Sequence, residues 1–137
     1  MRYWALPPIG LAIACASTSY TVTATAATPK PVADVYACVR AGIAPIGYTQ
    51  TSYDVDAHRL TARRFNEATH RPDVRFRRMV DELEIDVRAD STGRSAITVA
   101  SRTFAEYMTE RGQTLVQETA SDSVLAAGQA VLAACGH

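Results

Sequence analysis

The sequence has no long apolar run, no excess of charge of either sign and only three cysteines. A membrane-spanning helix needs roughly 18 or more consecutive apolar residues, and no stretch reaches that length, so the sequence predicts no transmembrane helix. Basic and acidic residues both number 14, so no overall field attracts nucleic acid or an anionic membrane. The chain of 137 residues has room for one domain.

Motifs that carry chemistry are also missing. The sequence contains no G-x-S-x-G nucleophile elbow, no S-x-x-K pattern and no glycine-rich phosphate loop. The three histidines are scattered without an i, i+4 pair, which argues against a metal site. The alternating carboxylates Glu82, Glu84 and Asp86 fit the solvated face of a strand better than an acid/base pair. We therefore expect no enzyme, with no catalytic residues, no cofactor and no metal.

The amino end matches an export signal. A short basic start at Arg2 is followed by mostly small and apolar residues over 5–16, a stretch too short to span a bilayer. We expect residues 1–16 to be a signal peptide, residues 17–30 to be a disordered linker rich in Ser, Thr and Ala, and residues 31–137 to form one domain. The expected location is the periplasm or the membrane surface, with secretion as the alternative.

Two kinds of processing remain open. The residues before Cys15 resemble a bacterial lipobox, although the leucine, Leu11, lies four residues before the cysteine and Ala12 takes the usual position. A lipid on Cys15 would anchor the protein to a membrane without spanning it. Ordinary cleavage between residues 16 and 27 is the alternative, and Ala14-Cys15-Ala16 and Ala24-Thr25-Ala26 both have the required small residues.

Export would leave Cys38 and Cys135 as the cysteines of the domain. In an oxidising compartment they are natural disulfide partners, and closing a loop of this length contributes about 4.7 kcal/mol in the chain-entropy model. The alternative is a pair of buried free thiols in a reducing compartment. We predict the disulfide Cys38–Cys135.

Hydrophobic periodicity predicts a helix at each end of the domain and four strands between them. The region 105–117 fits either a continued strand or a loop, with Gly112 as a break, and Thr119 with Asp122 resembles a helix capping box. The fold class is α+β, a four-stranded antiparallel meander with the N- and C-terminal helices packed on one face. The predicted helices cover residues 31–44 and 119–135, and the predicted strands cover residues 48–53, 59–65, 79–89 and 94–104.

The first hairpin carries the one resemblance that we find. The segment from Gly47-Tyr48-Thr49 to Asp56, followed by Leu60-Thr61-Ala62-Arg63-Arg64, resembles a pattern of small exported bacterial proteins of unknown function, many of which look like envelope lipoproteins. The element order is also similar to helix-and-sheet domains of accessory lipoproteins in outer-membrane assembly machinery. The resemblance implies an envelope protein and brings no active-site residue with it.

Charge is unevenly placed along the chain. Residues 59–78 hold seven arginines against two carboxylates, and residues 81–90 hold five carboxylates against one arginine. One interpretation is cross-strand pairing of Arg59 and Arg63 with the acidic strand. The other is a contact site for an anion or a partner. That site would use the arginines of the connecting loop, Arg71, Arg75, Arg77 and Arg78.

Three functions fit these features. The first is a non-enzymatic envelope or secreted protein that binds another protein or an anionic surface, and not nucleic acid. The second is a small-molecule or lipid binder with a pocket of roughly 300 Å³ between helices and sheet. The third is a small exported enzyme inhibitor that uses the 66–78 loop as its probe.

Overall fold

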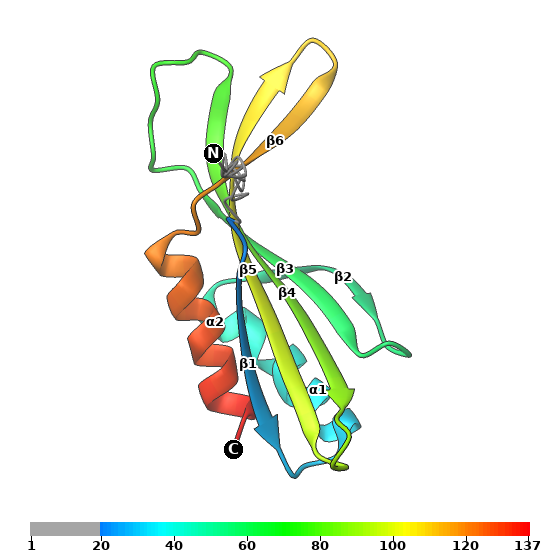
Figure 1. Ribbon diagram of the computed structural model, residues 1–137. Helices are drawn as coiled ribbons and strands as arrows, with labels where there is room; N and C mark the ends of the chain where they lie inside the picture. The colour runs from blue at the N-terminus through cyan, green and yellow to red at the C-terminus, as the bar shows by residue number, and fades with distance from the viewer. Residues whose placement is uncertain (1–19) are drawn as a thin grey trace, which may run out of the picture.

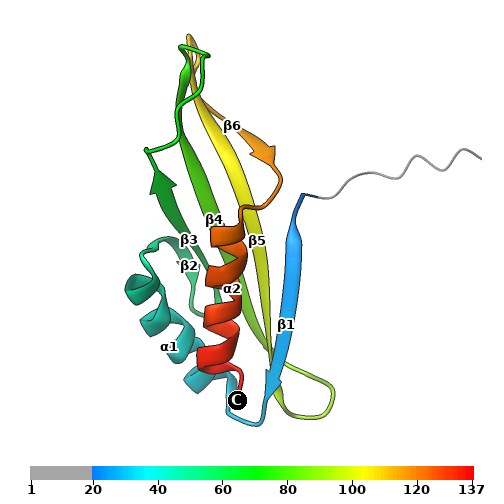
Figure 2. The same ribbon diagram turned by 90° about the vertical axis from the view of Figure 1, so that its left-hand side faces the viewer.

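The computed structural model describes residues 20–137, which form an antiparallel sheet with two helices on one face (Figures 1 and 2). The predicted α+β class is confirmed. The signal peptide, its cleavage before Cys15 and the lipid on Cys15 concern residues outside the described part, whereas the range 16–27 given for ordinary cleavage extends into it. The strands are β1 (Val22–Thr28), β2 (Thr49–Asp54), β3 (Arg59–Asn66), β4 (Phe76–Ala89), β5 (Ser95–Thr109) and β6 (Gly112–Glu118). The helices are α1 (Val32–Ile43), the short 3-10 helix η1 (Ala44–Ile46) and α2 (Asp122–Cys135).

The sheet has six strands, so the prediction of four was wrong. Strands β2 to β5 form the expected meander, in the order β1-β5-β4-β3-β2, and β6 also pairs with β5. The sixth strand arises because β5 runs on to Thr109 and the chain then turns back. Gly112, at a φ of +105°, begins the returning strand instead of ending regular structure.

The expected linker over 17–30 contains strand β1, which corrects the prediction of disorder there. Its alternating threonines and alanines bury little apolar surface, which is why composition suggested a linker. The strand instead pairs its backbone with β5 over its whole length, from Val22 opposite Ser101 to Thr28 opposite Ser95. Ala24 and Ala26 pack against the core. Small, β-branched and polar side chains are therefore enough at a sheet edge where the backbone pairs along the whole strand.

The core lies between the sheet and the two helices. In α1 the buried residues recur at helical spacing as expected, and Pro31 stands at the N-cap. Helix α2 begins later than predicted, because Ser121 and not Thr119 caps it: the Ser121 side chain accepts a hydrogen bond from the Val124 N–H at 3.1 Å. The largest fully buried side chains of the core include Val35, Val39, Leu60, Leu83, Ile85, Ile97, Val99 and Val124.

The two helices lie side by side on the sheet, and a disulfide joins them (Figure 2). Cys38 of α1 and Cys135 of α2 have Cα atoms 5.9 Å apart although 97 positions separate them in sequence, which confirms the predicted pair. Gly128 lets α2 approach β5 closely, because a Cβ there would lie 2.9 Å from the Ser101 hydroxyl oxygen. Over residues 20–137, neither helix has the length and apolar character needed to cross a bilayer.

Candidate functional site

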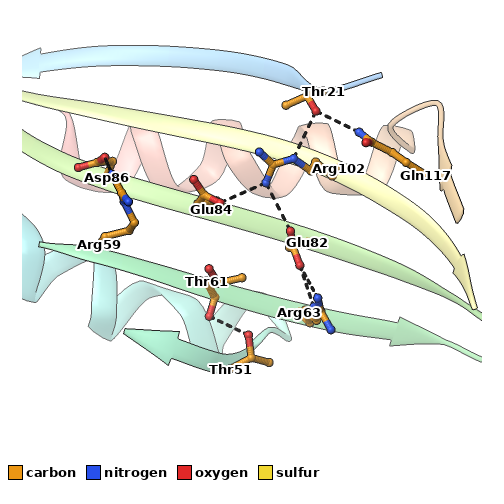
Figure 3. Close-up of polar contacts among 10 residues, drawn as sticks. All are labelled: Thr21, Thr51, Arg59, Thr61, Arg63, Glu82, Glu84, Asp86, Arg102 and Gln117. Carbon is orange, nitrogen blue, oxygen red and sulfur yellow. Dashed lines mark hydrogen bonds and ion pairs between the residues drawn. The ribbon is translucent and has the colours of Figure 1, made fainter. Parts of the chain in front are cut away.

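The open face of the sheet carries a ladder of ion pairs across neighbouring strands (Figure 3). Arg59 lies opposite Asp86 and Arg63 opposite Glu82, each with its closest nitrogen and oxygen 2.8 Å apart. The predicted pairing of β3 with the acidic strand is therefore confirmed. Burial opposes ionisation of Asp86, but hydrogen bonds from Arg88 and Arg59 outweigh it and hold the pKa of this carboxyl below its usual range. These charges fix the strand register.

Beyond the helices the sheet continues as an arm, which we define as residues 65–79 and 104–118. Figure 1 shows the end of β5, β6 and the connection before β4 extending past both helices. Val74, in that connection, is 98% exposed, more than any other large hydrophobic residue described. The arm is therefore the part of the molecule with the least cover.

Arg71 fastens the connection to β6. Its two terminal nitrogens donate to the two carboxylate oxygens of Glu118 at 2.5 and 2.7 Å, and one of them also donates to the Tyr107 hydroxyl at 3.2 Å. Its guanidinium lies 5.2 Å from the centre of the Phe76 ring. The bidentate bond raises the pKa of Arg71 and lowers that of Glu118. Arg71 is thus occupied within the protein.

Arg78 is also occupied. Its guanidinium stacks 3.7 Å from the centre of the Phe65 ring, and its nitrogens lie 3.3 Å from carboxylate oxygens of Glu67 and Glu106. Glu106 is only 3% exposed, so it needs a cation beside it. Arg78 compensates this buried carboxylate, and its removal would leave an unpaired charge inside the arm.

Arg75 and Arg77 are the accessible members of the predicted set. Arg75 pairs only with Asp73, two residues away, at 3.1 Å, and 65% of its side chain is exposed. This bond raises the pKa of Arg75 and lowers that of Asp73. The Arg77 side chain is exposed and has no hydrogen-bond or ion-pair partner among residues 20–137. The four arginines therefore do not converge on one point, and the two accessible ones lie close to Val74 in the chain.

A polar cluster that sequence reasoning missed lies where the arm joins the body. The carboxylate of Asp81 accepts hydrogen bonds from the hydroxyls of Thr103, Ser121 and Ser123 at 2.8, 2.9 and 3.0 Å. It also pairs with Arg64 at 3.3 Å. The cluster joins β3, β4, β5 and the start of α2 at one carboxylate, and we call it the Asp81 hub.

One signal in the sequence could have identified this residue. Asp81 lies two residues before Leu83 and four before Ile85 along β4, so all three side chains point to the same, buried face of the strand. The run of acidic neighbours hid this, because Glu82, Glu84 and Asp86 do point to the open face. A carboxylate on the apolar face of a strand needs partners, and the hydroxyls of the α2 cap supply them.

Three hollows adjoin these groups, and the largest of the three, of about 460 Å³, is lined by Arg75, Thr109, Glu110 and Arg111 on the arm. Another, of about 260 Å³, lies beside the hub and is lined by Asn66, Thr69, Arg71, Met79 and side chains of the hub. The third, of about 300 Å³, lies on the arm and is lined by Asp73, Arg75, Tyr107, Thr109, Thr114 and Val116. These hollows lie outside the space between helices and sheet, where the alternative of a small-molecule or lipid binder would need its pocket and where packed core side chains stand instead.

Within the described residues, no three His, Cys, Asp or Glu side chains come together in a way that could hold a metal ion. No protein-family model matches the chain, and no curated protein sequence matches it significantly.

Proposed function

We propose that the chain is an exported, non-enzymatic protein of the cell envelope that binds another protein through its arm. The observation that best supports this proposal is the almost fully exposed side chain of Val74, which lies in the chain between the accessible Arg75 and Arg71, which is held by Glu118. Arginine is enriched among the residues that dominate binding energy at interfaces, and the exposed Val74 side chain adds apolar area that a partner can bury. The Arg71 clamp keeps the loop ordered before binding, which lowers the entropic cost of association.

Two features support export. The Cys38–Cys135 disulfide is typical of proteins that fold in an oxidising compartment. The leader at residues 1–16 has the composition of a signal peptide. Cleavage after Ala26 would remove most of β1 and leave the edge of β5 uncovered, so we place processing at Cys15 or after Ala16. Intact-mass analysis of the protein from its native host reports the cleavage site, any acyl chain and the disulfide together.

A photo-crosslinking side chain at position 74 tests the arm. Val55, which is 51% exposed in the turn between β2 and β3, is the matched control position, because it lies away from the arm (Figure 1). We expect one discrete crosslinked species from position 74 in the native envelope and none from position 55. Replacing Arg75 and Arg77 by Ala should reduce the amount of this crosslinked species without changing the midpoint temperature of thermal unfolding. Equal crosslinking at both positions, or none at 74, contradicts the proposal.

A second candidate is a small-molecule ligand, favoured by the arm hollow of about 300 Å³. Its lining combines the Tyr107 ring and Val116 with the Arg75 guanidinium, a combination suited to a ligand with an apolar part and an acidic group. Native mass spectrometry of protein purified from the host would detect a retained ligand. A mass that matches the processed chain alone removes this candidate.

A further inference from the structure

One edge of the sheet is open along strand β1. Strand β1 pairs with β5 on the side away from β4, and Figure 2 shows it at the margin of the sheet with no described segment beyond it. Its first residues adjoin the end of β6, where Gln117 donates a hydrogen bond to the Thr21 hydroxyl at 3.0 Å (Figure 3). The outward N–H and C=O groups of β1 belong to Thr23, Thr25 and Ala27. The Ala27 carbonyl accepts a hydrogen bond from the Arg94 guanidinium at 3.5 Å, and the remaining groups form an accessible row of donors and acceptors.

This edge has little of the usual protection against strand pairing, apart from the Arg94 side chain at the Ala27 end. Edge strands are normally protected by a charged residue, a proline, or a bulge that twists the strand away. The sequence of β1, VTATAAT, contains neither charge nor proline, and its seven residues pair with β5 without a register shift. The prolines at 29 and 31 lie just after the strand and limit its length, but they do not cover its edge.

The opposite edge, strand β2, has these protections. Its register against β3 shifts between Gln50 and Ser52, which marks a bulge. Near its end, the Arg40 guanidinium stacks 5.3 Å from the centre of the Tyr53 ring, and the strand ends on the charged Asp54. One edge of this sheet is thus guarded and the other is open, although both belong to one small domain.

We propose that strand β1 pairs antiparallel with strand β1 of a second copy of this chain. With Thr25 on the two-fold axis, Ala24 faces Ala26 of the other copy and Thr23 faces Ala27. Every pair joins small, uncharged side chains, so the edge is complementary to itself and its approach meets no local repulsion. The chain also carries equal numbers of basic and acidic residues, so two copies do not repel through net charge. A single pair of seven-residue strands is a small interface, so we expect micromolar affinity.

Residue 25 on the axis gives a sharp test. Opposite residues of an antiparallel pair have Cα atoms about 4.5–5.5 Å apart, which a disulfide can bridge. The full chain is expressed with its leader in the native host, where processing either lipidates Cys15 or removes it, so that the introduced cysteine is the free thiol. Under mild oxidation, Thr25→Cys should give a disulfide-linked dimer. Thr23→Cys should give no such dimer, because residue 23 lies opposite residue 27 of the second copy, four positions away from residue 23 of that copy. Ser52→Cys, on the β2 edge, should give no such dimer either.

Sedimentation equilibrium supplies the second measurement. Thr25→Lys places two ammonium groups across the axis and should raise the dissociation constant of the dimer about tenfold or more while the folded state persists. Self-pairing requires processing upstream of β1, so the intact mass of the same sample is measured first and separates a failure of processing from a failure of pairing.

Three results would overturn self-pairing. The first is a protein that is monomeric at about 100 µM and whose Thr25→Cys variant forms no crosslink, since a micromolar dimer would be populated there. The second is a dimer that Thr25→Lys leaves unchanged. The third is crosslinking of the Thr25→Cys variant only when other envelope proteins are present, which would assign the edge to a foreign strand.

Discussion

Replacing Tyr48 by Phe should make the protein more stable. Tyr48 is 3% exposed, and its hydroxyl has no hydrogen-bond partner among the described residues. A buried polar group without a partner costs about 1–3 kcal/mol, so removing it should raise the free energy of unfolding by about 1 kcal/mol near neutral pH. Tyr36 provides the opposite case, because its hydroxyl donates to the Arg59 carbonyl oxygen at 3.1 Å. We expect Tyr36→Phe to lower stability by about 1 kcal/mol.

The same side chain predicts a dependence on alkaline pH. Burial, and then the nearby Asp81 carboxylate, raise the pKa of Tyr48 to about 12, while Arg64 partly offsets them. In the unfolded chain this phenol ionises near pH 10, so the folded state binds the proton more tightly. The wild-type protein therefore loses stability as pH rises from about 10 to about 12, by about 1.4 kcal/mol at pH 11. Tyr48→Phe lacks this loss, so its advantage should grow to about 2.4 kcal/mol at pH 11.

Urea unfolding at pH 8 and pH 11, followed by circular dichroism, measures both effects. The other tyrosines are common to the two proteins and cancel in the difference. Tyr53→Phe, at a residue that is 59% exposed, is the control and should change stability little at either pH. A Tyr48→Phe protein that is less stable than the wild type at pH 8, or whose advantage is the same at both pH values, would refute this account of the buried hydroxyl.

Three further predictions concern the sulfur bridge, the hub and the edge strand. Replacing Cys38 and Cys135 together by Ser should lower the free energy of unfolding by about 4–5 kcal/mol, which urea titration with and without reductant would measure. Asp81→Asn should cost about 2–3 kcal/mol because Arg64 loses its ion pair, whereas Asp56→Asn, at an exposed turn, should be neutral by the same assay. A chain that begins at residue 27 should unfold at lower urea than one that begins at residue 20, and an unchanged midpoint would show that β1 is dispensable.

The meander and the disulfide could be predicted because their signals are local and regular. In β4, Leu83, Ile85 and Val87 alternate with charged residues, and this fixes both the strand and its buried face. The helical stripes at the two ends of the domain then left Cys38 and Cys135 one arrangement in which they could meet. Here the local pattern constrained the topology, and the topology constrained the disulfide.

Strands β1 and β6 lacked such signals. An edge strand buries few apolar side chains, so its composition does not differ from that of a linker or a loop. The Ala/Thr alternation of β1 and the exposed Thr114 and Val116 of β6 are compatible with several states. Pairing with β5 decides between them, and that partner is about 70 positions away from β1 in the sequence.

The arginine loop shows the same limit for the site. Seen along the chain, the four arginines form a basic cluster. In the folded protein Glu118 reaches Arg71 from β6, and Glu106 reaches Arg78 from β5. Both carboxylates come from distant segments, so no local count of charge could reveal that Arg71 and Arg78 are neutralised.

The ion pairs within the protein restrict the surfaces at which a partner can bind favourably. Most arginines near the sheet satisfy carboxylates of the same chain, and the open face of the sheet is a ladder of such pairs, already compensated in the free protein. A partner docking there would have to break those pairs and would gain little net electrostatic energy in exchange. The surface around Val74 and the edge of β1 differ, because a bound partner would cover an apolar side chain in one case and satisfy a row of backbone groups in the other. Binding at either place removes few existing interactions, of which the bond from Arg94 to the Ala27 carbonyl is one, so these two surfaces are where association should be strongest.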